Sequence, residues 1–307
     1  MRRVIRGSAV LALLVAATAI SPSTGSARVR TATDVTVSVD WLAQHLKDRD
    51  VVILQVSPRA EYDKEHIPGA RSIDPRTTDN FEAPMASGAD MDMTALPTEA
   101  ALHAKLEKLG ISDGSHVVVA FGSPSVVMAT RTIFLLKYAG VEDVSLLDGG
   151  LAAWKRGGHP VSAVGPAVVP GHYTRHIQPA IAVNYAYVQS HLHTPHFRII
   201  DAREPVYYHS ASAIDGMVPG HVPGAGNVPF NSLFDDTSGL RPASAIEASF
   251  RAAGVQPGDT VIAYCHVGLQ ATAVVLSARA VGIPAKMYVG SFHDWTAHHL
   301  PTEIEKQ

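Results

Sequence analysis

Residues 260–271, Thr-Val-Ile-Ala-Tyr-Cys265-His-Val-Gly-Leu-Gln-Ala271, carry the only cysteine of the 307-residue chain. A strand-like apolar run ends at Tyr264, and a helix-like run begins at Ala271. The turn between them directs Cys265 toward the amides of a helix N-terminus, where unpaired N–H groups and the helix dipole favour a thiolate. This position predicts a nucleophile. The alternative is a buried, unreactive cysteine, which more often lies in the middle of a strand or helix.

The order of segments around this turn occurs twice in the chain. Each copy has three short apolar runs and one longer helical run. In the first half the apolar runs are 51–55, 116–120 and 144–147, and the helical run is 125–139. In the second half the apolar runs are 198–201, 261–264 and 286–289, and the helical run begins at 271. Such alternation is typical of a parallel sheet covered by helices. Gly140 and Gly282 are expected to end the helix at the same place in each copy. The sequence therefore predicts an α/β fold with two domains of similar topology.

The first 27 residues have the parts of a secretory signal peptide. Three arginines precede position 7, an apolar run extends from Ala9 to Ile20, and small residues follow at 25–27. The apolar run is too short for an ordinary membrane span, and the alternative is an uncleaved anchor or a disordered tail. We expect a periplasmic or secreted protein with no membrane attachment after cleavage.

The rest of the chain divides at a segment rich in Pro, Gly and Ala. We expect an N-terminal domain at 28–160, a linker at 161–180 and a C-terminal domain at 181–307. A lone cysteine cannot form an internal disulfide, so an exported thiol is expected to be either buried or used. The formal net charge of −3 gives no indication of nucleic-acid binding, and 46% apolar residues suffice for well-buried cores.

The ordered set of motifs resembles the tandem-domain rhodanese-type sulfurtransferases, the thiosulfate / 3-mercaptopyruvate sulfurtransferase family. The motifs are Asp201-Ala-Arg203, Gly220-His-Val-Pro-Gly-Ala-Gly-Asn-Val-Pro-Phe230, the cysteine turn, and Gly290-Ser-Phe-His-Asp-Trp295. The resemblance implies two rhodanese-like domains, each a mainly parallel sheet with helices on both faces. It also implies that the C-terminal domain is catalytic and the N-terminal domain degenerate, and Phe121-Gly-Ser-Pro-Ser125 indeed has no cysteine.

The same resemblance implies a mechanism. Cys265 would take a sulfane sulfur from a small donor of the thiosulfate or 3-mercaptopyruvate class as a persulfide, and pass it to a thiol or cyanide acceptor. The amides of the turn would converge on the sulfur, so the implied donor-binding residues are His266, Val267, Gly268, Leu269, Gln270 and Arg203. No metal or cofactor is required, and a monomer is expected. The six-residue loop, Cys265 to Gln270, has the length associated with sulfur transfer; phosphatases and arsenate reductases of this fold carry one residue more.

The sequence departs from the family pattern at the donor site. Thiosulfate-using members commonly have Arg and Lys directly after the cysteine and mercaptopyruvate-using members Gly-Ser, whereas this chain has His266 and Val267. Tyr207 stands where a second arginine is expected, and Arg203 has either a structural or a donor-binding role. Because a charge-assisted contact contributes about 1.5–3 kcal/mol, we expect weak use of thiosulfate. Two alternatives remain: a non-catalytic sulfur-carrier or binding module, and an oxyanion enzyme of the same fold.

Overall fold

The computed structural model describes residues 35–75, 96–122, 126–214 and 216–304. The expected signal peptide at 1–27 and residues 123–125 of the first-domain loop lie outside these ranges. No helix within the described ranges is both long and apolar enough to cross a membrane.

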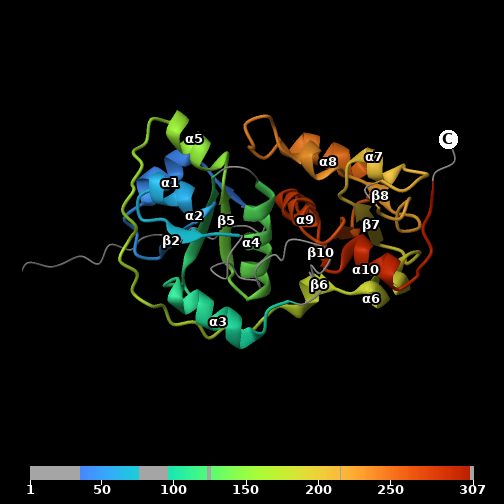
Figure 1. Ribbon diagram of the computed structural model, residues 1–307, viewed down its shortest axis with the longest axis horizontal. Helices are drawn as coiled ribbons and strands as arrows, with labels where there is room; N and C mark the ends of the chain where they lie inside the picture. Colours follow the sequence, from blue (N-terminus) through green and yellow to red (C-terminus); the bar gives the residue numbers. More distant parts are fainter. Residues whose placement is uncertain (1–34, 76–95, 123–125, 215, 305–307) are drawn as a thin grey trace, which may run out of the picture. The chain divides into compact units, whose positions relative to one another are not determined.

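The first domain is a five-stranded parallel sheet in the order β1-β5-β4-β2-β3 (Figure 1). Its strands are β1 Thr36–Val37, β2 Val51–Val56, β3 Arg71–Ile73, β4 His116–Phe121 and β5 Asp143–Leu147. Its helices are α1 Val39–His45, α2 Arg59–Lys64, α3 Glu99–Lys108, α4 Val126–Tyr138 and α5 Gly150–Arg156. The apolar runs of the sequence thus form the central strands.

The second domain repeats this topology with the strand order β6-β10-β9-β7-β8, again all parallel. Its strands are β6 Ala182–Val183, β7 Phe197–Asp201, β8 Gly226–Asn227, β9 Thr260–Tyr264 and β10 Ala285–Tyr288. Its helices are α6 Tyr185–His191, α7 Pro205–Tyr208, α8 Ala243–Ala252, α9 Ala271–Ala280 and α10 Ser291–Ala297, with 3₁₀ turns η1 Pro179–Ile181 and η2 Phe230–Leu233. The prediction of two α/β domains of the same topology is confirmed.

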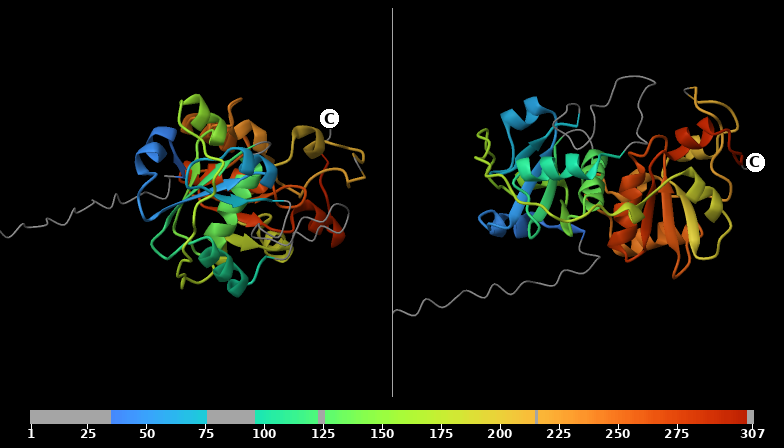
Figure 2. Two further views of the ribbon diagram at one scale, coloured as in Figure 1. Left: turned by 60° about the vertical axis from the view of Figure 1, so that its left-hand side comes forward. Right: turned by 90° about the horizontal axis from the view of Figure 1, so that it is seen from below.

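Both faces of each sheet are covered by helices, as the views in Figure 2 show. In the central strand β4, Val117 and Val119 pack with side chains from α3 and α4, while Val118 and Ala120 pack with those from α1, α2 and α5. Because side chains alternate along a strand, a strand buried on both faces is apolar at most positions. This explains the continuous apolar runs that predicted the fold.

The two copies also agree in individual contacts. Trp154 and Trp295 are fully buried, and each donates its indole N–H over 2.8 Å to a backbone carbonyl six residues further on. His66 and His221 each stack on a tyrosine ring at 3.9 Å and bond its backbone carbonyl. These residues hold the core and the turns of each domain.

The two domains meet through α4 and α9, which lie side by side in Figure 1. Apolar side chains from these helices belong to one continuous core that includes the inner faces of both sheets. Each helix is followed by a glycine with positive φ, Gly140 at 92° and Gly282 at 76°, as expected from the sequence. The helix pair therefore connects the first domain directly to the elements that carry Cys265.

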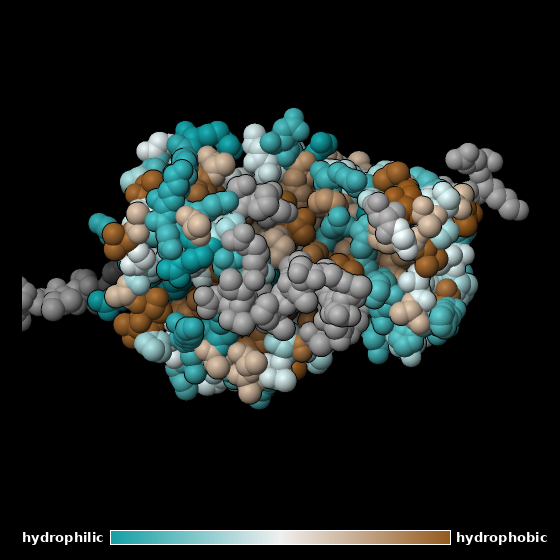
Figure 3. Space-filling view, viewed as in Figure 1, coloured by the Kyte–Doolittle hydropathy of each residue, from teal (hydrophilic) through white to brown (hydrophobic). Residues whose placement is uncertain are grey.

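The segment between the domains runs largely without regular structure from 161 to 178 and is tied to the first domain. Gly171 donates its N–H to Glu107 O over 2.8 Å, and Tyr173 donates its hydroxyl to Ala139 O over 3.0 Å. Exposed valines occur along this segment, and on the face shown in Figure 3 hydrophobic residues are interspersed with hydrophilic ones. Apolar residues scattered in this way are ordinary for a protein surface.

Candidate functional site

Cys265 directly follows β9, whose neighbours in the sheet are β10 and β7. The chain turns through residues 266–270 and enters α9 at Ala271, as the sequence predicts. Loops at the carboxyl ends of parallel strands are the usual place for ligand sites in open α/β sheets. The cysteine is buried, with an exposure of only 1%.

The backbone of Gly268 brings an amide to the sulfur. Its N–H donates a hydrogen bond to Cys265 Sγ over 3.1 Å. Its φ of +85° is the left-handed conformation, and a Cβ added there would lie 2.5 Å from Val289 O and 2.9 Å from Met287 Cε. Only glycine fits this position, and the amide that it presents favours a thiolate or a persulfide anion at residue 265.

The start of α10 fixes the backbone of Cys265, the first residue of the loop. Cys265 donates its N–H to Ser291 Oγ over 3.2 Å, and Ser291 Oγ donates to Tyr288 O over 3.0 Å. Phe292 donates its N–H to Cys265 O over 2.9 Å. Ser291 is fully buried and has φ +56°, a strained conformation for a serine and the one that Gly150 adopts at the start of α5. Residue 291 is thus a position where glycine would be less strained, but only serine provides the hydroxyl that fixes the backbone of Cys265.

Tyr207 and His266 lie against each other. Their ring centroids are 4.7 Å apart with the ring planes at 86°. Two of the three positions where the family pattern has cations are therefore brought together, and an aromatic pair occupies them. Val267, Leu269 and Gln270 are partly buried, and Gln270 Oε1 is buried without a hydrogen-bond partner among the described residues.

Arg203 lies in a buried ion pair. Its side chain is 1% exposed and donates to both carboxylate oxygens of Asp201, at 2.6 and 3.0 Å, and to Gly220 O at 2.8 Å. The guanidinium also lies 4.0 Å from the centroid of the Phe292 ring. Burial alone lowers the pKa of Arg203, but the hydrogen bonds and charge of Asp201 outweigh it and raise the pKa above its ordinary value. Of the two roles open from the sequence, these contacts favour the structural one.

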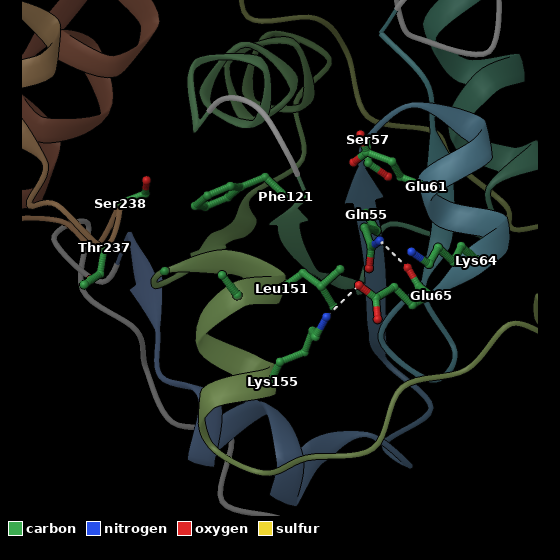
Figure 4. Close-up of a pocket in the computed structure, with 13 residues that line it drawn as sticks. Gln55, Ser57, Glu61, Lys64, Glu65, Phe121, Leu151, Lys155, Thr237 and Ser238 are labelled. Atoms are coloured by element: carbon green, nitrogen blue, oxygen red, sulfur yellow. Dashed lines mark hydrogen bonds and ion pairs between the residues drawn. The ribbon is translucent and has the colours of Figure 1, made fainter.

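The first domain has a pocket at the equivalent place, which has a volume of about 470 Å³ (Figure 4). The strand register places Gln55 where the second domain has Asp201, and Phe121 where it has Cys265. Gln55 bonds the backbone of Ile67 and Glu65, and the Glu65 carboxylate pairs with Lys155 at 2.6 Å. The pocket therefore has a phenylalanine in place of the nucleophile, and Thr237 and Ser238 of the second domain complete its wall.

Two contacts of the cysteine loop were missed in the sequence. One is the Ser291 hydroxyl, although the Gly290-Ser element itself was recognised as part of the repeat. The other is Arg131 of α4, which donates to Gly268 O from the other domain. Within the described residues, no group of three His, Cys, Asp or Glu side chains is arranged to hold a metal ion.

Comparison with known proteins places the chain in a family. The Rhodanese-like domain model matches residues 38–157 and 184–298. The chain is 28% identical to 3-mercaptopyruvate sulfurtransferase of Escherichia coli K12 over 88% of its length and 98% of the relative's. It is 30% identical to thiosulfate sulfurtransferase of Pseudomonas aeruginosa over 86% of its length and 94% of the relative's.

A solved structure gives the same result. The crystal structure of a 3-mercaptopyruvate sulfotransferase from Escherichia coli superposes with a TM-score of 0.71 at 27% identity, covering 84% of this chain and 98% of that one. The relatives include enzymes named for either donor, so family membership does not fix the donor. The chain belongs to the tandem rhodanese-domain sulfurtransferases of the thiosulfate / 3-mercaptopyruvate sulfurtransferase family, whose substrates are small sulfur donors and acceptors.

Proposed function

We propose that this chain moves a sulfane sulfur from a small donor to a thiophilic acceptor through a persulfide on Cys265. The observation that carries the proposal is the 3.1 Å hydrogen bond from Gly268 N–H to Cys265 Sγ, in a six-residue loop between β9 and α9. An amide donor at this distance favours the anionic forms of sulfur on which both half-reactions depend.

In the first half-reaction the Cys265 thiolate attacks the sulfane sulfur of the donor. An S–S bond forms at the cysteine as the donor's bond to that sulfur breaks. Thiosulfate leaves as sulfite, whereas 3-mercaptopyruvate leaves as the pyruvate enolate, which then takes a proton. In the second half-reaction a thiolate or cyanide attacks the outer persulfide sulfur, and the electrons of the S–S bond return to Cys265. The two products leave in turn, as in a ping-pong cycle.

The donor site favours a donor other than thiosulfate. An edge-to-face pair, Tyr207 and His266, occupies two of the places expected to hold cations, Val267 occupies the third, and Arg203 is engaged with Asp201. A small dianion would therefore lack about 1.5–3 kcal/mol for each missing charge-assisted contact. We expect a higher KM for thiosulfate than for 3-mercaptopyruvate, which carries a carboxylate and a carbonyl.

Steady-state sulfur transfer to cyanide, measured with each donor in turn, tests this function. Turnover with at least one donor that disappears in Cys265→Ser, with an unchanged fold by circular dichroism, supports it. Binding of a partner that persists in Cys265→Ser, with no turnover in the wild type, would favour a sulfur-carrier module. Cys265-dependent hydrolysis of an aryl phosphate by the wild type would favour an oxyanion enzyme.

We further propose that the protein is exported and acts as a monomer. The N-terminal pattern over 1–27 supports export to the periplasm or the medium. Cell fractionation with N-terminal sequencing of the recovered protein tests this, and a chain retained in the cytoplasm with its first residues intact would contradict it. Light scattering of the purified protein measures its mass in solution and so tests whether it is a monomer.

A further inference from the structure

Two consecutive residues of α4, in the first domain, reach the cysteine loop of the second. The side chain of Arg131 is 2% exposed, and its guanidinium donates a long hydrogen bond of 3.4 Å to Gly268 O. The same nitrogen lies 3.6 Å from Met287 Sδ, and the guanidinium carbon lies 5.6 Å from the centroid of the Phe134 ring. A positive charge is thus buried directly behind the glycine that bonds the sulfur.

The preceding residue, Thr130, contacts the residue that holds the next carbonyl of the loop. Thr272 of α9 donates its hydroxyl to Leu269 O over 2.6 Å, and the hydroxyl of Thr130, which donates to Val127 O over 2.9 Å, lies 2.8 Å from the Thr272 hydroxyl. Thr130 and Thr272 are both buried. Arg131 therefore bonds the carbonyl of Gly268 directly, whereas Thr130 packs against the threonine that bonds the carbonyl of Leu269.

From this arrangement we propose that Arg131 is a positioning residue for sulfur transfer, supplied to the cysteine loop by the otherwise degenerate first domain. In a planar trans peptide the C=O and the following N–H point in opposite directions. Because the carbonyl of Gly268 is held toward Arg131 and that of Leu269 toward Thr272, the N–H groups of Leu269 and Gln270 point away from these two side chains. Gly268 N–H bonds Cys265 Sγ.

The charge of Arg131 acts in the same direction. A buried guanidinium is screened less by water than an exposed one, so it stabilises a nearby anion more strongly. The thiolate and the persulfide of Cys265 are the anions formed in the loop. Loss of Arg131 therefore removes both an orienting hydrogen bond and a favourable charge.

The inference rests on the proposed function but can be tested separately, in the full-length protein. The rate of Cys265 alkylation by iodoacetamide is measured against pH, and persulfide formation is measured in a single turnover. Arg131→Met is expected to slow Cys265 alkylation at neutral pH and to slow persulfide formation about 10- to 100-fold. Arg131→Lys should fall between the variant and the wild type, because it keeps the charge but loses the planar donor.

Thr130→Val should slow alkylation by a smaller factor. Thr132→Val is the matched control, because among the described residues its hydroxyl on the same helix bonds only Met128 O one turn earlier, and it should leave the alkylation rate unchanged. The other titratable or charged groups around the loop are kept in every variant; they are His266, Tyr207, His293 and the Arg203–Asp201 pair.

A lower Tm with wild-type rates of alkylation and persulfide formation in Arg131→Met and Arg131→Lys would overturn the proposal, because it would show that Arg131 serves packing alone. If Arg131→Met does not fold, the same measurements on Arg131→Lys and Thr130→Val decide the proposal. A wild type that forms no persulfide would contradict the proposed function instead, while the alkylation profiles would still decide the role of Arg131.

Discussion

Gly268 donates its backbone N–H to the Sγ atom of Cys265 over 3.1 Å, from a left-handed conformation with φ +85°. The same glycine presents its carbonyl to Arg131 of the other domain. One residue thus links the nucleophile to the domain interface, and the consequences of changing it can be stated in advance.

Gly268→Ala is expected to distort the loop, because the new Cβ would lie 2.5 Å from Val289 O. We expect a loss of about 1–3 kcal/mol in the free energy of unfolding and at least a ~100-fold loss of kcat/KM. Gly258→Ala is the matched control, since Gly258 has φ +88° but open space around its Cα. Urea unfolding and steady-state kinetics of both variants check the prediction, and equal activity losses in the two would contradict it.

Ser291→Ala and Ser277→Ala should have opposite effects on stability, although both serines are fully buried. Ser291 Oγ accepts the N–H of Cys265, so its loss leaves a buried donor unsatisfied and destabilises by about 1–3 kcal/mol. Ser277 Oγ has no hydrogen-bond partner among the described residues, so alanine there is expected to be neutral or stabilising by about 1 kcal/mol. Chemical denaturation measures both. A stable Ser291→Ala with unchanged sulfur transfer would show that the hydroxyl does not hold the loop.

Arg203→Met is expected to destabilise the protein by about 3–5 kcal/mol, because it leaves the buried Asp201 carboxylate without its partner. Adding Asp201→Asn should recover part of this loss, and the double-mutant cycle gives the coupling energy. Denaturant unfolding of the four proteins makes the measurement. If Arg203→Met instead keeps its stability and only raises the KM of the donor, the arginine faces substrate and the structural role is wrong.

His266→Arg should raise kcat/KM for thiosulfate by about 10- to 100-fold, because it places a permanent cation directly after Cys265. The effect on 3-mercaptopyruvate, which carries one carboxylate, should be smaller. Tyr207 packs against this side chain, so Tyr207→Phe serves as a control that keeps the ring. Parallel kinetics with the two donors give the ratio, and an unchanged ratio would contradict a donor preference set by charge at residue 266.

The fold was predictable because its evidence is local. The central strands are buried on both faces, so their apolar runs nearly coincide with the observed elements; the run at 144–147, for example, became Asp143–Leu147. The helix predicted from Ala271 begins at that residue, and the glycines after α4 and α9 have the positive φ expected of helix ends. The repeat of the same order in both halves removed the remaining ambiguity.

The candidate site was predictable only in part. The position of Cys265 at the end of a strand followed from the sequence. The expected convergence of amides from His266 to Gln270 is seen as a direct hydrogen bond only from Gly268 N–H. Arg131 lies 137 positions from Gly268, and Ser291 lies 26 positions from Cys265, so no local pattern could reveal these two contacts.

Sulfur transfer through Cys265 is tested most simply by the intact mass of the reduced protein after incubation with thiosulfate and, separately, with 3-mercaptopyruvate. We expect a gain of about 32 Da, the mass of one sulfur atom, with at least one donor; cyanide should reverse it, and Cys265→Ser should not show it. No gain with either donor, in a folded protein whose thiol still alkylates, would contradict sulfur transfer through Cys265 with donors of this class.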